Sequence, residues 1–372
     1  MPPRRRGRAA PRVVITGLGV VCPLAEDPAA LHEALCAGRS ALGPGPYPGE
    51  GRAACLPGRP AATAIAAMAA LRAVAERSDR EDIWVVCGSS ASDLARAEPA
   101  WGRYFQGADA GPDLLWPQLV HRPAEAARRA IGSRAPAIGV STACTSGATA
   151  LAQAVGLVEE GTARAALAIG VDVVCQMTWE GFGALGLRAP GACRPFDRRR
   201  DGLALGDAAA ALLVERLDDA RARGARVRAE VLGVGGAADG LDLAAPDPQG
   251  RGLRRAIRQV LDAPPPVVIA HATGTVKNDA AEARALAAEA PGAHVTALKG
   301  ALGHTLGAAA AVDAVVAVRI LETGRVPPVV GLEEPDVDLS LVRKPLLIDV
   351  DRCLTASAAF GGGCAAILLG RV

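Results

Sequence analysis

Short apolar runs alternate with alanine-rich stretches of helical periodicity along the whole chain. The predicted strands cover residues 12–21, 83–87, 137–140, 165–170, 209–215, 227–234, 267–270, 295–297, 346–350 and 365–369. The predicted helices cover residues 28–37, 61–77, 123–131, 147–160, 250–261, 279–289 and 307–323. Strands that alternate with helices are typical of α/β proteins whose largely parallel sheets are covered by helices.

The pattern of strands and helices starts again near Val227, after the charged stretch 215–226. We therefore expect two similar halves, residues 12–226 and 227–372, in one compact unit. Segments rich in Gly, Pro and Asp at 42–60, 97–116 and 239–250 are predicted to be connections or lids.

Composition and charge exclude several classes of protein. Half of the residues are hydrophobic but only 3% are aromatic, so Ala, Val, Leu and Ile must fill the core. The net charge is +2 and the one dense basic run is Arg4-Arg5-Arg6, which does not indicate a nucleic-acid binder. The apolar run 302–320 contains His304, Asp313 and Arg319, so it does not predict a membrane span.

The cysteines and the N-terminus indicate a cytoplasmic protein. Nine cysteines without a CxxC pair suggest reduced thiols rather than a disulfide framework. Basic residues 4–12 followed by the apolar run 13–21 imitate a signal peptide, but nothing later in the chain looks exported. We interpret residues 13–21 as a buried strand that ends in a glycine-rich turn. Gly17-Leu-Gly19 is a weak match to a dinucleotide-binding motif, because Cys22 stands at the third glycine.

Cys144 is the candidate nucleophile. It lies where a predicted strand passes into a predicted helix, and a helix N-terminus favours the thiolate form of cysteine. Its neighbours Ala143, Ser146 and Gly147 are small and leave space for a substrate. An inert buried cysteine is the alternative.

Two of the five histidines stand at strand-to-helix junctions, where the active sites of α/β proteins collect. His271 follows the predicted strand 267–270, and His304 precedes an alanine-rich helix. Lys299 lies five residues before His304 and is one of only three lysines. Structural histidines and a surface lysine are the alternatives. A zinc site of Cys144, His271 and His304 is disfavoured, because the spacing does not match common zinc patterns.

Five separated motifs resemble those of one enzyme family. They are Arg12-Val-Val-Ile-Thr-Gly-Leu-Gly19, Thr142-Ala-Cys-Thr-Ser-Gly147, Arg194-Pro-Phe-Asp-Arg-Arg-Arg-Asp-Gly202, His271-Ala-Thr-Gly-Thr275 with Lys299-Gly-Ala-Leu-Gly-His304, and Phe360-Gly-Gly-Gly363. In this order, over nearly the whole chain, they resemble the β-ketoacyl synthases, the condensing enzymes of fatty acid and polyketide synthesis. The resemblance implies a thiolase-like fold of two similar halves, layered α-β-α-β-α, and a dimer.

The resemblance also implies roles for individual residues. Cys144 would carry the growing acyl chain as a thioester. His271 and His304 would bind the malonyl thioester carbonyl and stabilise the enolate that forms as carbon dioxide leaves. Glu282 would hold Lys299, which would position His304.

The remaining implied roles belong to the backbone and the substrate arm. The N–H groups of Cys144 and Gly362 would form an oxyanion hole, and Phe360, Gly361 and Gly363 would shape the acyl-pocket loop. Thr273 and Thr275 would contact the phosphopantetheine arm. The resemblance implies no metal, flavin or nucleotide cofactor. The substrates would arrive on the phosphopantetheine of an acyl carrier protein.

The chain departs from the family pattern near two of these motifs. Ala272 replaces the first Gly of HGTGT, which is tolerable unless the position needs a positive φ. Gly362 stands where many members have a second Phe that gates the acyl pocket, and Cys364 and Ala366 replace the usual Gly and Asn. Ordinary gating is therefore in doubt.

The function that we expect is decarboxylative condensation of an acyl thioester with malonyl-carrier protein, in fatty acid or polyketide (including polyene) biosynthesis. A non-elongating acyltransferase on the same fold and a chain-length-factor-like, non-catalytic subunit of a heterodimer are the alternatives. Partners would be the carrier protein and a second ketosynthase-like subunit, in a homodimer or heterodimer. Arg198–Arg200 and Arg254–Arg258 are candidate docking patches for an acidic carrier.

Overall fold

The computed structural model describes residues 11–109 and 111–372. The basic run Arg4-Arg5-Arg6 and most of the basic start of the apparent signal peptide lie outside the described residues. Within them, no helix is long and apolar enough to cross a membrane.

The two halves repeat one strand order. In the first half β1 (Val13–Val21), β4 (Ile83–Gly88), β5 (Ala137–Val140), β6 (Ala165–Asp172) and β8 (Ala208–Arg216) are ordered β5-β4-β6-β8-β1. In the second half β9 (Ala229–Ala238), β10 (Val267–Ala270), β11 (His294–Ala297), β15 (Arg352–Ala358) and β16 (Gly363–Gly370) are ordered β11-β10-β15-β16-β9. Both orders read third-second-fourth-fifth-first along the chain.

The strand directions repeat as well. In each half the second strand is parallel to the third and fourth, and the fifth is antiparallel to the fourth and first. The prediction of two similar halves is therefore confirmed, although their sequences share little. We call the two strand sets the N-terminal arm and the C-terminal arm.

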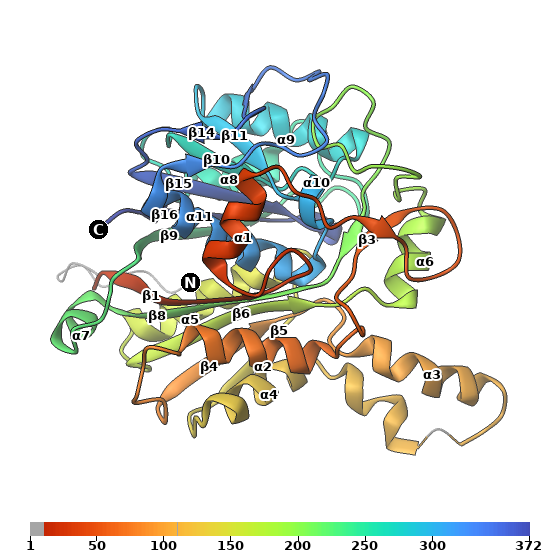
Figure 1. Cartoon of the computed structure of the whole chain (residues 1–372), viewed down its shortest axis with the longest axis horizontal. Helices are drawn as coiled ribbons and strands as arrows, with labels where there is room; N and C mark the ends of the chain where they lie inside the picture. Colours follow the sequence, from red (N-terminus) through yellow and green to blue (C-terminus); the bar gives the residue numbers. More distant parts are fainter. Residues whose placement is uncertain (1–10, 110) are drawn as a thin grey trace.

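The arms meet where β1 pairs with β9, at Val14 with Glu230 and Ile15 with Ala229. This pairing makes one eleven-stranded sheet, with β5 at one edge and β13 (Ser340–Leu341) at the other. Figure 1 shows the arms as two layers, one above the other, so the sheet folds back on itself at this junction.

Two helices fill the space between the arms. α5 (Ser146–Glu159) contacts β4, β6 and β8, and α11 (Ala309–Thr323) contacts α5 and strands of both arms. Twelve of the fifteen residues of α11 are buried, as expected of a helix that is apolar on all sides.

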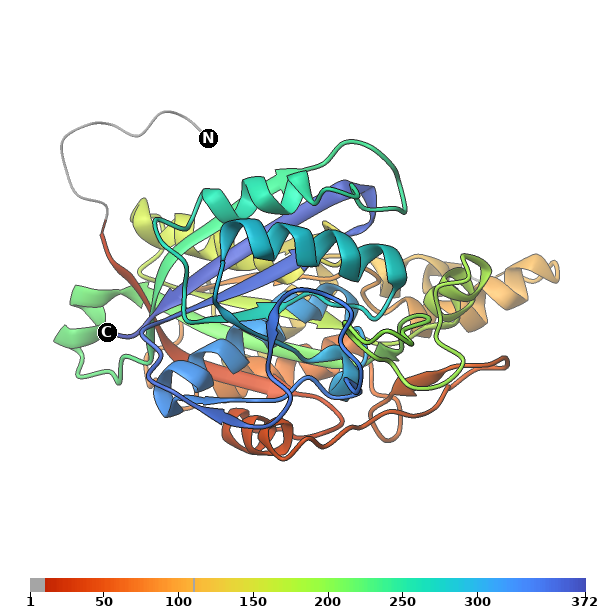
Figure 2. The ribbon, with the colours of Figure 1, turned by 90° about the horizontal axis from the view of Figure 1, so that it is seen from above.

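The outer faces of both arms are also covered by helices. α2 (Ala62–Ala73) and α4 (Arg122–Ile131) cover the N-terminal arm, and α8 (Arg251–Arg258) and α9 (Val276–Glu289) lie side by side over the C-terminal arm (Figure 2). The predicted α-β-α-β-α layering is confirmed.

Glycines let α2 approach β1 closely. A Cβ on Gly17 would lie 1.8 Å from the carbonyl oxygen of Ala73, and one on Gly19 would lie 2.0 Å from that of Ala69. The strand continues through both glycines to Val21, so the predicted glycine-rich turn is wrong. Helix packing, rather than nucleotide binding or a turn, explains this Gly-x-Gly segment.

Other elements differ from the prediction. α3 (Leu94–Phe105) begins before the segment 97–116 and runs through much of it, although that segment was predicted to be a loop, and α6 (Gln176–Ala184) and α7 (Leu217–Ala222) were not predicted. The predicted strand 346–350 is shorter, and only β14 (Leu346–Leu347) pairs with β12 (Arg325–Val326). The remaining short elements are α1 (Pro28–Cys36), β2 (Gly43–Pro44), β3 (Arg52–Ala54), η1 (Gly111–Leu114), η2 (Trp116–Gln118), β7 (Leu205–Gly206), α10 (Lys299–Leu302), η3 (Leu306–Ala308) and η4 (Phe360–Gly362).

Candidate active site

The fold brings Cys144, His271 and His304 together. Cys144 lies just before α5, and His304 precedes η3 and α11, the helix that occupies the equivalent place in the other half. His304 Nε2 lies 3.0 Å from Cys144 Sγ. The rings of His271 and His304 have centroids 5.2 Å apart and are nearly perpendicular. The internal repeat therefore places two central helix starts at one point.

Strained backbone accompanies each of the three side chains. Ala143 has φ 51°, Ala272 has φ 34° and Leu306 has φ 51°, and each is within two residues of one member of the trio. Such left-handed φ values are costly for residues with a Cβ and collect at functional sites. Ala272 has a positive φ, so alanine in place of the family's first HGTGT glycine is strained at this position.

Burial decides the resting state of Cys144. The side chain is buried, and this burial raises the pKa of the thiol to about 12, although the charge of Lys299 and the backbone N–H groups of Cys144 and Phe360 oppose the rise. Burial therefore opposes the preference of a helix N-terminus for the thiolate form of Cys144. A base must take the proton as the sulfur attacks.

The histidines can act as that base and as hydrogen-bond donors. Burial, and then the charge of Lys299, lowers the pKa of both His271 and His304 well below its usual value, so both rings are neutral at pH 7. In the described part of the chain the Nδ1 atoms of both rings are buried without a partner. For His304 it is Nε2 that meets the sulfur.

Glu282 supports the backbone at His271. Its carboxylate accepts hydrogen bonds from the N–H groups of His271 and Ala272, both at 2.6 Å. Burial raises the pKa of Glu282 to about 7. Among the described residues both Glu282 oxygens accept from backbone N–H groups and neither forms an ion pair with Lys299, so the expectation that Glu282 holds Lys299 is wrong. Lys299 is itself buried, and its charge has only a small lowering effect on the pKa of Glu282.

Two further buried carboxyl groups belong to this site. Asp279 on α9 accepts from the N–H groups of Phe196 and Gly274, which ties the Pro195-Phe196-Asp197 turn to the loop after His271. Asp313 on α11 is buried, one of its oxygens has no partner among the described residues, and Lys299 is the charge that opposes the rise of its pKa to about 6. The sequence signal was present, since Asp313 is the one acidic residue in the apolar run 302–320.

A cavity of about 570 Å³ opens above the trio. Cys144, His271 and His304 line it, together with Thr273 and Thr275, whose hydroxyl oxygens are 3.0 Å apart. The rest of its wall comes from the end of α6, the start of α9, and the segments 201–203, 239–246 and 358–364. A group bound to the sulfur could therefore extend toward solvent past both threonines.

The glycine-rich turn after β15 forms one side of this cavity. Phe360, Gly362 and Gly363 line it, and the Phe360 ring lies 5.4 Å from that of Phe182. The Gly361 N–H donates to the carbonyl of Leu243 at 2.7 Å.

Gly362 has φ 75°, and a Cβ there would lie 2.1 Å from Asp239 Oδ1. The Asp239 carboxylate therefore occupies the space that a side chain at position 362 would need. The donation of the Gly362 N–H to a reacting carbonyl stays a prediction.

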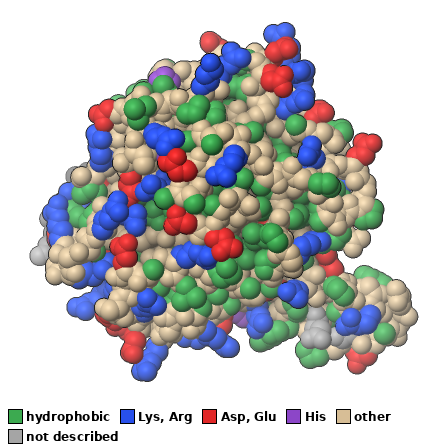
Figure 3. Space-filling model, in the orientation of Figure 1, with side chains coloured by type: hydrophobic (Ala, Val, Ile, Leu, Met, Phe, Trp, Pro, Cys, Tyr) green, Lys and Arg blue, Asp and Glu red, His purple; other side chains and the backbone are tan. Residues whose placement is uncertain are grey.

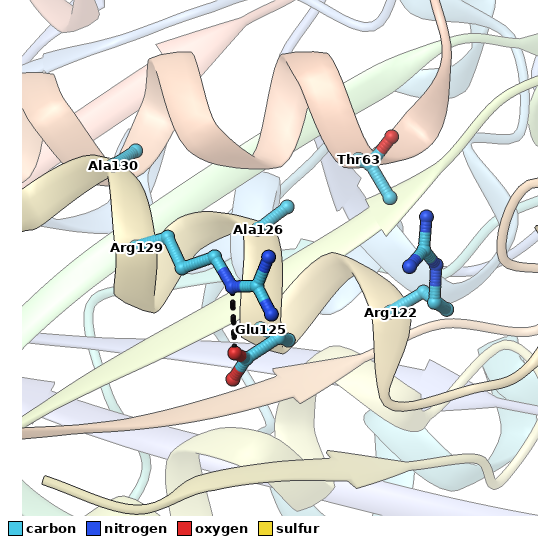
Figure 4. Close-up of a pocket in the computed structure, with 6 residues that line it drawn as sticks. All are labelled: Thr63, Arg122, Glu125, Ala126, Arg129 and Ala130. Carbon is cyan, nitrogen blue, oxygen red and sulfur yellow. Dashed lines mark hydrogen bonds and ion pairs between the residues drawn. The ribbon is translucent and has the colours of Figure 1, made fainter. Parts of the chain in front are cut away.

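A second cavity of about 460 Å³ lies between α2 and α4 (Figure 4). Arg129 donates to Glu125 at 2.8 Å on its floor, and Thr63 and Arg122 face it from the other end. It is lined by no cysteine or histidine, so we do not assign the chemistry to it. In residues 11–109 and 111–372 no group of three or more His, Cys, Asp or Glu side chains is placed to hold a metal ion.

Comparisons with known proteins agree with this geometry. The family model described as "Beta-ketoacyl synthase, N-terminal domain" matches residues 61–220, and "Beta-ketoacyl synthase, C-terminal domain" matches residues 228–333. The 3-oxoacyl-[acyl-carrier-protein] synthase 2 of Synechocystis sp. is 30% identical, over 94% of this chain and 96% of the relative. The oxytetracycline polyketide putative beta-ketoacyl synthase 1 of Streptomyces rimosus is 32% identical, over 97% of each chain.

Solved structures give the same result. A chain of the ishigamide ketosynthase/chain length factor superposes with a TM-score of 0.90 at 29% identity, over 98% of this chain and all of the other. A β-ketoacyl synthase from Burkholderia phymatum superposes with a TM-score of 0.90 at 27% identity, over 97% of this chain and all of the other. With two full-length relatives, both family models and a matching fold, the chain belongs to the β-ketoacyl synthase family.

Proposed function

We propose that the protein catalyses decarboxylative Claisen condensation of an acyl thioester with malonyl-carrier protein, with Cys144 as the acyl carrier. The observation that carries the proposal is the buried Cys144 thiol, 3.0 Å from a neutral His304 and facing a cavity that His271 also lines. Relatives over the whole chain bear the names of 3-oxoacyl-carrier synthases, which are acyltransferases that form carbon–carbon bonds.

In the first half-reaction Cys144 attacks the carbonyl carbon of an acyl thioester. As the carbon–sulfur bond forms, the thiol proton passes to Nε2 of His304, which is neutral and within hydrogen-bond reach. The bond to the carrier's sulfur breaks, and that sulfur takes the proton. The products are an acyl-Cys144 thioester and a free carrier thiol.

In the second half-reaction malonyl-carrier protein occupies the cavity and loses carbon dioxide. The electron pair of the broken carbon–carbon bond forms an enolate, whose oxygen needs hydrogen-bond donors. Neutral His271 and His304 each carry one N–H that can donate to this oxygen, and for His304 this requires the tautomer with the proton on Nε2, opposite to that of the first half-reaction. The enolate carbon attacks the carbonyl carbon of acyl-Cys144, and the carbon–sulfur bond to Cys144 breaks. The released Cys144 sulfur takes a proton from solvent, and a 3-oxoacyl carrier two carbons longer leaves.

A second subunit fits this proposal. A chain of a ketosynthase/chain length factor structure is among the similar solved structures. Cys144 is intact here, which favours the catalytic role over the chain-length-factor-like alternative. We propose that the protein acts as the catalytic half of a dimer, whose partner is either a second copy or a ketosynthase-like subunit.

Intact-protein mass spectrometry after incubation with acyl-carrier and malonyl-carrier proteins tests the proposal. We expect a thioester adduct on the wild type, no adduct on Cys144→Ala, and an elongated 3-oxoacyl carrier once malonyl-carrier is added. An adduct without elongation, with a ketosynthase-like partner present, would indicate the non-elongating acyltransferase instead. A folded wild type that takes no adduct from several donors would overturn the role of Cys144.

A further inference from the structure

The surface around the mouth of the active-site cavity has an unusual composition. We propose that this surface docks an acyl carrier protein mainly through apolar contacts, and not through a basic patch. The proposal rests on the proposed function, since a carrier-borne thioester has to enter through this mouth to reach Cys144.

Four large hydrophobic side chains line the cavity and are exposed at its mouth. They are Leu185 at 53% exposure, Leu243 at 84%, Val276 at 58% and Phe360 at 38%. They come from the end of α6, the loop 239–246, the start of α9 and the turn after β15, so they encircle the opening rather than lie on one helix. Hydrophobic side chains gathered in this way mark an interaction surface.

The charges at the same mouth are mostly negative. Asp201, Asp239 and Asp242 line the cavity against the single cation Lys277 among its lining residues. An acidic carrier helix laid on this mouth would meet carboxylates, and like charges at an interface are unfavourable. The chain has 41 Lys and Arg residues in all, but Lys277 alone of them lines this cavity.

The arginine patches expected to dock an acidic carrier are largely neutralised. Arg199 pairs with Asp197 and Glu333, and Arg200 pairs with Asp336. Arg254 and Arg258 both pair with Glu289. None of these arginines lines the cavity. On the face in Figure 3 basic and acidic side chains are interspersed, without one basic field.

The partner that this surface fits is an acyl carrier protein with apolar side chains on one helix. That helix lies next to the carrier's serine, to which the phosphopantetheine arm is attached. Leu243 is held in place for such a contact, because its carbonyl accepts from the Gly361 N–H. Lys277 is placed to meet the one negative charge that must pass the mouth, the phosphodiester of the phosphopantetheine arm. Apolar burial does not depend on ionic strength in the way that charge pairing does.

Carrier affinity in a Cys144→Ala background tests docking separately from catalysis. The probe is a fluorescently labelled, octanoyl-loaded type II carrier protein, and its Kd is measured by anisotropy at about 50 and about 500 mM NaCl. We expect Kd to change by less than about twofold with salt, where docking by charge would weaken about tenfold or more. We expect Leu243→Ser and Val276→Ser each to raise Kd by about fivefold.

Leu347→Ser is the matched control, because Leu347 is 74% exposed on β14 and does not line the cavity. We expect it to leave Kd unchanged. A tenfold salt dependence would overturn the proposal. Arg198 and Arg255 are both exposed. The proposal would also be overturned if Arg198→Glu or Arg255→Glu raised the Kd for the carrier while Leu243→Ser left it unchanged. Complete absence of carrier binding would overturn apolar docking, whereas acylation of the wild type by octanoyl-pantetheine would still support Cys144.

Discussion

Burial raises the pKa of three carboxyl groups around His271, Lys299 and His304, to about 6 for Asp279 and Asp313 and to about 7 for Glu282. Glu282 and Asp279 each accept two or more hydrogen bonds, and so their burial is compensated. Asp313 has an oxygen without a partner among the described residues. Of the three, Asp313 therefore opposes folding most when it is ionised.

Asp313→Asn should gain stability relative to the wild type as pH rises. The pKa of Asp313 is about 6 in the folded protein against 3.8 for the free group, so the folded state binds the proton more tightly. The contribution of Asp313 to the free energy of unfolding of the wild type is fully present below pH 3.8 and is lost as pH rises through 6. The loss amounts to about 3 kcal/mol, and the asparagine variant avoids it.

Urea unfolding at several pH values between the two pKa values and above them measures the difference. The exposed Asp338→Asn is the control, and its unfolding free energy should run parallel to that of the wild type. A difference between Asp313→Asn and wild type that is constant with pH would show that Asp313 is not a strained buried carboxyl.

At the scale of elements, close contacts set the position of whole strands. Gly19→Ala would put a methyl group 2.0 Å from the carbonyl oxygen of Ala69, on backbone that cannot yield without moving α2. We expect a loss of about 2–4 kcal/mol in the free energy of unfolding. Gly181→Ala on α6 is the control, because nothing lies within 4 Å of the added Cβ, and it should stabilise by about 0.5–1 kcal/mol. Equal effects of the two substitutions would contradict this account of β1–α2 packing.

The turn after β15 and the loop from Asp239 are coupled elements. Asp239 N–H donates to the Gly362 carbonyl at 3.0 Å, and its carboxylate lies where a side chain at position 362 would go. Gly362→Ala should cost about 2–4 kcal/mol, from the left-handed φ and from the contact with Asp239. In Asp239→Gly the same substitution should cost about 1–2 kcal/mol, the strain alone.

A double-mutant cycle by urea unfolding gives the coupling energy, which we expect to be about 1–2 kcal/mol. Strict additivity of Gly362→Ala and Asp239→Gly would contradict the claim that the carboxylate fills that space. The cycle also bears on gating, since the loop carries Leu243 at the cavity mouth.

The sequence predicted most long elements, because their apolar periodicity is set by burial against the sheets. It failed where local signals conflict with tertiary contacts. Helix α3 forms although it contains Pro99, and α6 forms although Gly181, Gly183 and Gly186 lie in or just after its last turn. Proline and glycine both disfavour helices, so the local sequence argues against these two. The apolar run 346–350 predicts one strand, but only Leu346 and Leu347 pair with another strand.

The site was predictable as far as residue type and motif carry information. The motifs brought Cys144, His271 and His304 to one proposed centre, and the fold places them there. Protonation and pairing depend on burial and on distances between segments far apart in sequence. The raised pKa of Cys144, the attachment of Glu282 to backbone N–H groups and the involvement of Asp313 could not be read from the chain alone.

At the scale of the whole molecule, an aromatic lobe stands away from the layered body. We call α3, η1 and η2 the lobe, and Figure 2 shows α3 extending beyond the arms. Four of the ten Phe, Trp and Tyr residues lie in it. Trp101 stacks on Phe105, and Tyr104 meets both rings edge to face. Phe105 is 79% exposed and Trp116 is 53% exposed.

The lobe borders the free edge of the sheet. β5 is the last strand of the N-terminal arm, and a Cβ on its Gly139 would lie 2.6 Å from the backbone of Val120 and His121, just past η2. An uncovered edge strand beside an exposed aromatic surface is a liability for a monomer. A second subunit that pairs along β5 and packs on the lobe would cover both features.

Light scattering coupled to size-exclusion chromatography tests this assignment. We expect the wild type to be dimeric at micromolar concentration, alone or with a ketosynthase-like partner. Phe105→Ser with Trp116→Ser should raise the dimer dissociation constant about tenfold or more, because aromatic anchors dominate such interfaces. Leu347→Ser again serves as the exposed control. A wild type that stays monomeric with and without such a partner, or a lobe variant that dimerises as tightly as wild type, would show that the lobe faces something other than a second subunit.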